Sequence, residues 1–351
     1  TTELHSLIAR QEWSRAKQRI LRDQDEIFMV DEECMTVLAL ACDRDAPEDV
    51  VRLILLSNPD LPAEPDRDGS FPLHYSCGKG TRVSVMKVLI EFYPEALGCQ
   101  NKFGNTPLQI AIERGVPSRV LRYMIEKNPG AASVPNRFGS YPLHYCGKDA
   151  SNVDIAKLLL ESYPPAIRKK NAYGATPLFL AVYWDAPIEI LRIMLREFPA
   201  AARIRDDRGI YPIASAWNLY VHRMRTDGTT DEEEASRVAE NRKALKNART
   251  PDDLVGSLGK WWSKIELLLK AAAHDSTSNS MPWSVVHAAS KGYCPPELLR
   301  FCIKLYKHQV VEKDEEGNLP IHIASSAPLY IKQAFETVNE PAIDKLLQVY
   351  P

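Results

Sequence analysis

The chain has 351 residues, with 44 basic and 46 acidic side chains and a formal net charge of −2. A nucleic-acid-binding surface usually needs a clear basic excess, so this balance argues against nucleic acid as a partner. The sequence contains no run of 18 apolar residues and no signal-peptide pattern, so we expect no direct insertion into a membrane.

The first 65 residues show a weak form of a pattern that becomes regular later. Apolar residues at helical spacing predict a degenerate pair of helices in residues 1–30. These residues are Leu4, Leu7, Ile8, Trp13, Ala16 and Ile20. The next unit, about 31–65, has Cys34 where later units have glycine, and Pro59 marks its closing turn.

A period of 35 residues dominates the middle of the chain. Glycines recur in matching context at Gly69, Gly104, Gly139, Gly174 and Gly209. The pattern is fullest at Asp66–Tyr75 and Asn136–Tyr145, and it predicts units at about 66–100, 101–135, 136–170 and 171–205. A strict repeat indicates an array of stacked units, because no single unit can bury its own apolar face.

Each unit is predicted to be a turn, a short helix, a second helix and a connecting loop. Glycine can hold the positive φ that the turn demands, and the Asp or Asn that opens it can cap neighbouring N–H groups. Thr106-Pro107 and Thr176-Pro177 have the residues of a helix N-cap and first turn. One proline series starts the second helix, at Pro47, Pro117, Pro187 and Pro295. Another follows that helix, at Pro94, Pro129, Pro164 and Pro199.

The unit at about 206–278 is longer than one period and therefore carries an insertion, near 221–260. This insertion is polar, and Thr230–Glu233 is a capping-box pattern that predicts a solvated helix to about Ala248. It is either an inert surface excursion or a regulatory, partner-contacting arm. Units at 279–313 and 314–351 bring the predicted total to about nine. Because the chain starts at Thr1 and stops near a closing proline, we expect a fragment or a processed chain.

The block from Ser70 to His74 and its copies resemble the opening of the ankyrin repeat, with its Thr-Pro-Leu-His-x-Ala signature. The resemblance extends over nearly the whole chain. It implies an all-α ankyrin-repeat solenoid of stacked helix-turn-helix units. The Pro-Leu-His-Tyr-x-Cys motif and the 35-residue period also resemble the ankyrin arrays of diatom-like algae. This resemblance bears on the source organism more than on the role of the protein.

Histidines and acidic residues give no sign of catalysis. His74, His144, His287 and His322 share one repeat slot. In a solenoid they form a line instead of converging, and the resemblance implies that each braces a turn by bonding to neighbouring backbone. The run Asp231–Glu234 is typical of a solvated helix start. There is no phosphate-binding glycine loop, His-Glu-x-x-His or nucleophile elbow, so we predict no enzyme, no cofactor and no metal site.

The cysteines bear on the compartment. The chain has seven, and no two of them form a Cys-x-x-Cys pair. Most are expected to be small buried hydrophobes. An odd number of unpaired thiols suits a reducing compartment, so we expect an intracellular location in the cytoplasm, the nucleus or an organelle interior.

The resemblance implies that partners contact the turn tips and the inner face of the first helix. Three successive tips carry an aromatic residue just before the glycine. The candidate protein-binding residues are these three and those expected beside them: Phe103, Phe138, Tyr173, Tyr183, Trp184, Lys102, Arg137, Arg114 and Lys148. Aromatic residues ringed by basic ones are typical of binding hot spots. Alternatively, each tip aromatic packs only on the next tip.

The sequence therefore predicts a non-enzymatic scaffold or adaptor that binds a partner protein, whose identity it does not name. Two alternatives stay open. The chain could be a structural subunit of a large assembly, which would purify as a complex of fixed stoichiometry. It could also be the recognition module of a larger enzyme or channel, which the full-length transcript would reveal.

Overall fold

The computed structural model describes residues 2–78, 82–223, 246–254, 256–273, 284–290, 296–314 and 317–320, together with residues 236, 240, 243, 244 and 323. Within these residues the secondary structure is α-helix and 3-10 helix, and the only bridge between extended residues is an isolated one from Val30 to Thr36. The chain divides into two compact units, Thr1–Tyr173 and Gly174–Pro351.

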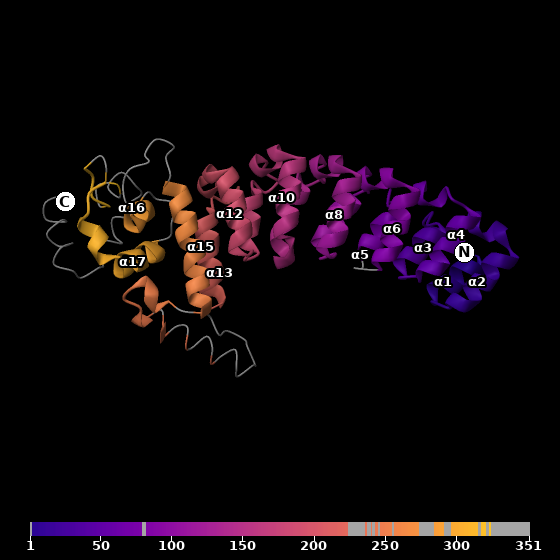
Figure 1. The fold of residues 1–351 in the computed structure, drawn as a ribbon, viewed down its shortest axis with the longest axis horizontal. Coiled ribbons are helices and arrows are strands. Elements are labelled where there is room, and N and C mark those ends of the chain that lie inside the picture. Colours follow the sequence, from indigo (N-terminus) through magenta and orange to yellow (C-terminus); the bar gives the residue numbers. More distant parts are fainter. Residues whose placement is uncertain are drawn as a thin grey trace. The chain divides into compact units, whose positions relative to one another are not determined.

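The first unit is a stack of helix pairs (Figure 1). Its α-helices are α1 (Glu3–Ala9), α2 (Trp13–Arg22), α3 (Val37–Asp43), α4 (Glu48–Ser57), α5 (Pro72–Gly78), α6 (Val83–Phe92), α7 (Pro107–Glu113), α8 (Ser118–Lys127), α9 (Pro142–Tyr145) and α10 (Val153–Ser162). The odd-numbered helices pack in sequence, α1 on α3, α3 on α5, α5 on α7 and α7 on α9. Among the even-numbered helices, α2 packs on α4, α4 on α6 and α8 on α10. The predicted helix pair in residues 1–30 is thus confirmed as α1 and α2.

The second unit continues with helices of the same kind. Its elements are α11 (Pro177–Tyr183), α12 (Ile188–Glu197), η8 (Pro199–Arg203), α13 (Pro212–Arg223), η9 (Pro251–Asp253), α15 (Gly256–Ala273), α16 (Val285–Ser290), α17 (Pro296–Leu305) and η10 (Lys307–Val311). Here α13 packs on α11, α15 on α13, α16 on α15 and α17 on α16. No helix within the described ranges is long and apolar enough to cross a membrane.

Local capping explains where the helices begin. The Thr106 hydroxyl accepts a hydrogen bond from the Gln109 N–H at 3.3 Å, and the Gln109 side chain accepts one from the Thr106 N–H at 2.8 Å. This reciprocal capping box starts α7. At the start of α11 the Thr176 hydroxyl accepts a hydrogen bond from the Phe179 N–H at 3.2 Å, without the reciprocal bond of a capping box. Both N-cap predictions are confirmed.

Both proline series mark helix starts. Pro47, Pro117 and Pro187 are the N-cap residues of α4, α8 and α12, as predicted, while Pro295 lies outside the described residues. The second series was expected to mark a loop, and there the structure differs. Pro94, Pro129, Pro164 and Pro199 each open a five-residue 3-10 helix: η3 (Pro94–Gly98), η4 (Pro129–Ser133), η7 (Pro164–Arg168) and η8. Proline suits this position because its φ is fixed and its missing N–H has no partner to lose.

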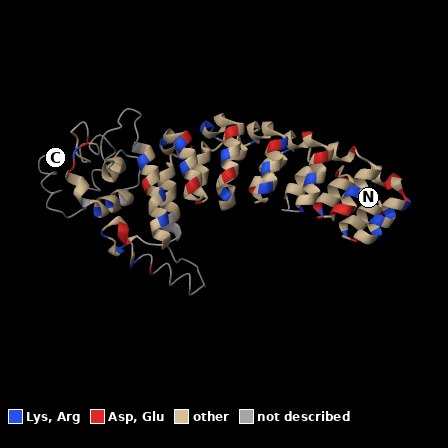
Figure 2. Ribbon diagram, in the orientation of Figure 1, with Lys and Arg blue, Asp and Glu red and all other residues tan. Residues whose placement is uncertain are grey.

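The core follows the period. The first-helix slot is buried at Leu73, Leu108, Leu143, Leu178 and Ile213, and the second-helix slot is buried at Val85, Val120, Ile155 and Ile190. The other face of the second helices is solvated. Charged residues of both signs lie along α8 and α10 (Figure 2).

The unit at 136–170 departs from the regular form. Its first helix, α9, has only four residues and is followed by two 3-10 turns, η5 (Cys146–Lys148) and η6 (Ala150–Asn152). Gly147 replaces the larger apolar residue found elsewhere in its slot, such as Ile112. Ala150 replaces a residue that elsewhere has a positive φ, as at Gly115, where φ is 71°. Alanine resists that conformation, so the helix end is rebuilt.

The insertion is described only in part. The capping-box pattern Thr230–Glu233 and the acidic run Asp231–Glu234 lie outside the described residues. At its far end, Ala248, Leu254 and Leu258 are buried, and the Lys304 ammonium donates to the Lys246 carbonyl at 2.6 Å. Residues 246–254 and 256–258 are therefore packed into the second unit.

Candidate partner-binding surface

Side chains within the turn hold each tip of the first unit. The Asn136 side-chain oxygen accepts hydrogen bonds from the N–H groups of Phe138 and Ser140, both at 3.0 Å. The Asn101 oxygen makes the same pair with Phe103 at 3.0 Å and Asn105 at 3.1 Å. Such bonds fix the turn locally.

Backbone hydrogen bonds then join one tip to the next. The Lys102 N–H donates to the Asp68 carbonyl at 2.7 Å, and the Arg137 N–H donates to the Phe103 carbonyl at 3.2 Å. The Ala172 N–H donates to the Phe138 carbonyl at 2.7 Å. Equivalent tip residues are thereby held side by side in register.

This register brings the three predicted tip aromatics into a row, called here the tip row: Phe103, Phe138 and Tyr173. Their exposed fractions are 52%, 49% and 62%. The Phe138 and Tyr173 rings stack with centroids 6.2 Å apart, and the Lys102 ammonium lies 5.0 Å from the Phe103 ring centre. Each aromatic thus packs on a neighbour and still presents about half of its surface to solvent.

The inner helices add a second row, which is not among the residues predicted from the sequence. Tyr75, Ile110 and Tyr145 occupy one slot of successive first helices, and all three are half-buried. The Tyr75 hydroxyl donates to the Asp66 carboxylate, and the Asn136 amide donates to the Tyr145 hydroxyl at 2.8 Å. These bonds aim the phenols at the tips, so the slot forms a floor beside the tip row. Burial raises the pKa of both phenols, and at Tyr75 the bond to Asp66 adds to this shift. The 35-residue spacing of the slot was the available signal.

The predicted basic residues occupy two different places. Lys102 and Arg137 are exposed at the tips, where the Lys102 ammonium lies 2.6 Å from the Asp68 carboxylate. Arg114 follows the last residue of α7, and Lys148 pairs with Glu113 at 2.8 Å. They lie beyond the C-terminal ends of the inner helices, about 10 Å from the tips for a seven-residue helix.

Tyr183 and Trp184 belong to the second unit. Tyr183 is the last residue of α11 and is exposed, while Trp184 is half-buried at the helix C-cap. The next residue, Asp185, accepts a hydrogen bond from the Lys264 ammonium of α15 at 2.6 Å. This contact ties the end of α11 to α15.

The histidine slot is structural, as the resemblance implied. His74 accepts the Phe71 N–H at 3.1 Å through Nδ1 and donates through Nε2 to the Asn105 carbonyl, in the next tip, at 3.0 Å. His287 makes the matching contact with the Asn318 carbonyl at 3.1 Å. In the unit that follows His74, Gln109 occupies the histidine slot, and its side-chain amide donates to the Ser140 carbonyl at 2.8 Å. Burial lowers the pKa of His74 to about 4.

No cluster of chemically reactive groups emerges elsewhere in the described part of the chain. His322 lies outside it, and no group of three or more potential metal ligands occurs within it. The described cysteines form no disulfide. Cys42, Cys77 and Cys146 are buried, as expected, and burial raises the pKa of each thiol.

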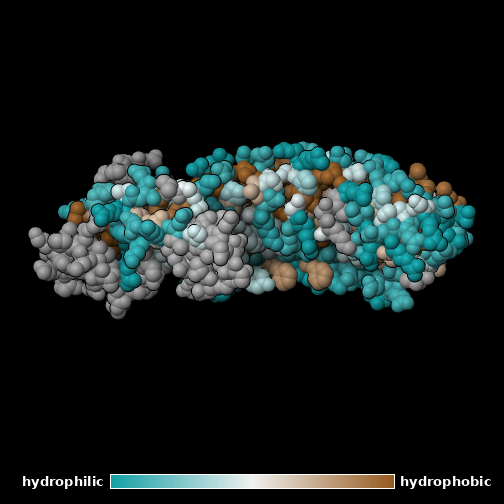
Figure 3. Space-filling view, turned by 90° about the horizontal axis from the view of Figure 1, so that it is seen from below, coloured by the Kyte–Doolittle hydropathy of each residue, from teal (hydrophilic) through white to brown (hydrophobic). Residues whose placement is uncertain are grey.

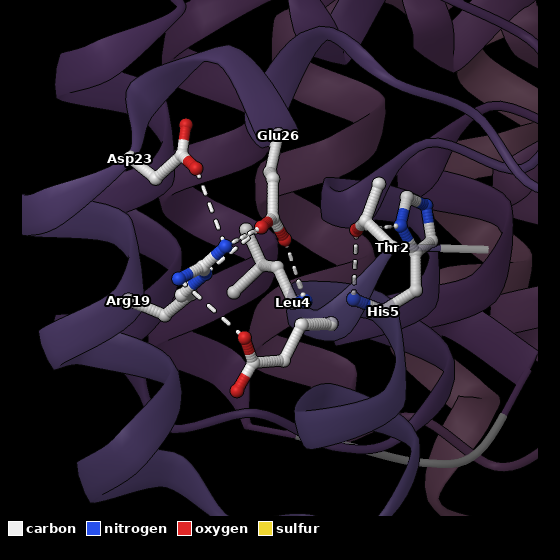
Figure 4. Close-up of polar contacts among 7 residues, drawn as sticks. Thr2, Leu4, His5, Arg19, Asp23 and Glu26 are labelled. Carbon is white, nitrogen blue, oxygen red and sulfur yellow. Dashed lines mark hydrogen bonds and ion pairs between the residues drawn. The ribbon is translucent and has the colours of Figure 1, made fainter.

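A polar cluster at the N-terminal end ties α1 to α2 (Figure 4). The Arg19 guanidinium contacts the carboxylates of Glu26, Asp23 at 3.2 Å and Glu3 at 3.4 Å. Glu26 also accepts the Leu4 N–H at 2.8 Å. Burial raises the pKa of Glu26, but hydrogen bonds from Arg19 and Leu4 outweigh this and hold it below its usual value. Every member has a partner within the cluster, so we assign it a structural role.

Helix pairs stacked with their tips in register define a helical solenoid repeat protein. The family model described as ankyrin repeats in three copies matches residues 38–132 and 73–171. Residues 38–171 thus contain recognised ankyrin repeats, and the predicted all-α ankyrin-repeat fold is confirmed, while the count of about nine units stays a prediction. Ankyrin-repeat domains generally mediate protein–protein interactions and are typically non-enzymatic.

Solved structures with a similar fold are also ankyrin domains. The ankyrin repeat domain of human ASB11 is 21% identical with a TM-score of 0.48, over 61% of this chain and 90% of that one. The ankyrin repeat domain of Bcl-3, a member of the IkappaB protein family, is 18% identical with a TM-score of 0.47, over 61% of this chain and 93% of that one. No curated protein sequence matches the chain significantly.

Proposed function

We propose that this chain is a non-enzymatic scaffold or adaptor that binds a partner protein along the tip row and the inner-helix floor of the first unit. One observation carries the proposal: three half-exposed aromatic side chains stand in register on a backbone that hydrogen bonds already hold. A surface ordered before binding loses little conformational entropy on association. Aromatic side chains on such a surface are the usual carriers of binding energy.

The array itself indicates that the tip aromatics are not needed for folding. The slot of Phe103 holds Asp68 in the preceding unit and Glu33 in the unit before that. All three tips use the same Asx turn, since Asp66 and Asp31 accept from the matching N–H groups. A polar residue therefore suits the turn as well as an aromatic one does.

Charge indicates the kind of partner. Lys102 and Arg137 stand exposed beside Phe103 and Phe138. A partner that places an apolar anchor on the tip row would bring its flanking residues near these cations. We therefore expect acidic residues around that anchor, which would favour association most at low salt.

The test compares capture of partner proteins by the intact chain and by single variants. Phe138→Ala should weaken binding of the true partner about thirtyfold, the usual loss at a hot spot of about 2 kcal/mol. Phe92→Ala is the matched control, because Phe92 is an exposed aromatic on α6, outside the tip row. Partners found by quantitative mass spectrometry would be confirmed by titration calorimetry with purified proteins.

Two outcomes would change the assignment. Equal binding by Phe103→Ala, Phe138→Ala and the native chain would make the tip row a packing feature. In that case Tyr183→Ala and Trp184→Ala would test the second unit next. Recovery of the chain only within a complex of fixed stoichiometry would favour a structural subunit.

A further inference from the structure

A second exposed apolar surface lies at the N-terminal end of the first unit. We call it the N-terminal apolar patch and define it as Leu21, Phe28, Met29, Val30 and Leu56. Leu56, Leu21 and Phe28 are 78%, 67% and 62% exposed. Figure 3 shows hydrophobic side chains reaching the surface at this end, beside largely hydrophilic neighbours.

The patch is formed by elements that pack on one another. Leu21 is near the end of α2 and Leu56 near the end of α4, in the same repeat slot. These two helices pack together, and η1 (Gln24–Phe28) packs on both. Phe28 closes η1, and Met29 and Val30 continue directly from it.

Other units show that the fold does not require apolar residues in these slots. The slot of Leu21 and Leu56 holds glutamate in the next three units, at Glu91, Glu126 and Glu161. The slot of Phe28 holds a small residue in the next three units, at Ala63, Gly98 and Ser133, and arginine in the two after them. Because the fold accepts polar or small residues in these slots, the large exposed apolar side chains at this end need an explanation other than folding. A contiguous exposed apolar patch commonly marks an interaction site.

The rim of the patch is acidic. Asp25 and Asp60 share one slot and are both exposed. Glu32 and Glu33 are exposed directly after Val30, and Glu64 is exposed in the next unit, in the slot that Met29 occupies in the first. Among the cations nearby, Arg22 is exposed beside Leu21, while Arg52 and Lys17, one turn before Leu56 and Leu21, pair with Glu48 and Asp49. An apolar centre with a mainly acidic rim complements an apolar helix face flanked by lysine or arginine.

We propose that the N-terminal apolar patch binds a cationic amphipathic helical segment of a partner protein. The apolar face of that segment lies on Leu21, Leu56 and Phe28, and its basic residues face the rim carboxylates. The proposal is independent of the tip row, since the two surfaces share no residue. It also predicts a basic partner segment, whereas the tip row, which is flanked by Lys102 and Arg137, is expected to bind an acidic one.

The test uses the whole chain and a fluorescent peptide of about 18 residues, made of leucine and lysine with leucine at helical spacing. Binding is followed by fluorescence anisotropy. We expect saturable one-to-one binding, weakened about tenfold or more by Leu56→Glu and by Phe28→Ser. Both changes install residues that other units already carry in those slots, so the variants should fold, which circular dichroism would check. A peptide with glutamate in place of lysine should bind at least about tenfold more weakly.

Leu56→Glu separates the proposal from simple charge attraction. The substitution adds a negative charge, so binding driven by charge alone would become tighter in this variant. Unchanged or tighter binding by Leu56→Glu, or no saturable binding by the native chain, would overturn the proposal. So would sedimentation velocity that shows a native dimer abolished by Leu56→Glu, because a second copy would then be the occupant. Binding of the native chain to neutral phosphatidylcholine vesicles, lost in the same variant, would overturn it in favour of a lipid surface.

Discussion

Two tip glycines with nearly the same backbone should respond very differently to alanine. Gly104 has φ 73° and Gly139 has φ 68°, so the conformational cost of a Cβ is about equal at both. That cost is about 1–2 kcal/mol for the left-handed region. The lower chain entropy of unfolded alanine offsets about 0.5–1 kcal/mol of it. Gly139→Ala should therefore lose about 1 kcal/mol of stability.

Gly104→Ala meets a steric cost in addition. A Cβ at Gly104 would stand 2.5 Å from the Arg137 backbone nitrogen, whereas at Gly139 the nearest atom is the Asn171 Cα at 3.5 Å. Moving the Arg137 backbone strains the bond from its N–H to the Phe103 carbonyl. Overpacking of this kind costs about 1–3 kcal/mol, and a weakened hydrogen bond adds up to about 1 kcal/mol. Together with the conformational cost of about 1 kcal/mol, we expect a total loss of about 2–5 kcal/mol.

The measurement is urea denaturation of each variant, followed by circular dichroism, with the free energy of unfolding taken from the first cooperative transition. Gly104→Ala should be less stable than Gly139→Ala by at least about 1 kcal/mol. Equal losses at the two positions, or a larger loss at Gly139, would refute the idea that the bonds between tips fix the tip spacing. Because Gly104→Ala displaces the Phe103 tip, it should also weaken partner binding more than Gly139→Ala does.

Three further substitutions test the core, the turn and the histidine slot. Leu143→Ala should lose about 2–5 kcal/mol of stability in a denaturant melt, because Leu143 is buried between units, and a loss below about 0.5 kcal/mol would exclude a core role. Cys34→Gly should gain about 0.5–1 kcal/mol in thermal melts, because Cys34 has a φ of 61°, and a loss would contradict strain there. Burial holds the pKa of His74 at about 4, below its unfolded value of about 6.5, so protonation favours unfolding. Neutral His74 should contribute on the order of 3 kcal/mol to the free energy of unfolding, in full above about pH 6.5 and progressively less toward pH 4. His74→Gln should remove this pH dependence if the histidine slot is its source.

The sequence predicted those parts of the fold that depend on short-range interactions repeated in each unit. Asx side chains, turn glycines and threonine caps act within a few residues, so their spacing alone located the turns and the helix starts. The buried leucine slot followed from the same period. The connecting 3-10 helices were not predicted, because a proline that follows a helix usually marks its end. In the structure Pro94 and its equivalents begin a new turn of 3-10 helix.

The unit at 136–170 shows where the pattern stops being sufficient. Its motif is nearly identical to that of residues 66–75, yet α9 is cut to four residues. Two single changes, Gly147 and Ala150, alter the inner face and the helix end. Asn152 is then buried, and neither polar atom of its side chain has a hydrogen-bond partner in the described structure. The period fixes the position of a unit, but the residues between the signature positions decide how well its helices form.

For the candidate site, the sequence located the tip aromatics but not their surroundings. The aromatic row followed from equal spacing, and the structure places its members side by side. The basic residues were grouped by sequence proximity to the first helices, which does not separate the two ends of a helix. Lys102 and Arg137 therefore lie at the tips, while Arg114 and Lys148 lie at the opposite helix ends. The floor of Tyr75, Ile110 and Tyr145 could not be predicted from spacing alone, because the direction of the two phenols depends on their hydrogen bonds with Asp66 and Asn136.

The two proposed surfaces together distinguish a scaffold from a simple binder. The tip row presents aromatics beside Lys102 and Arg137, whereas the N-terminal apolar patch presents aliphatic residues and Phe28 beside acidic residues. Opposite charge means that a partner suited to one surface is repelled by the rim of the other. Because the surfaces share no residue, occupation of one leaves the side chains of the other available. A chain with both properties could hold two different partners at once and choose each by its charge.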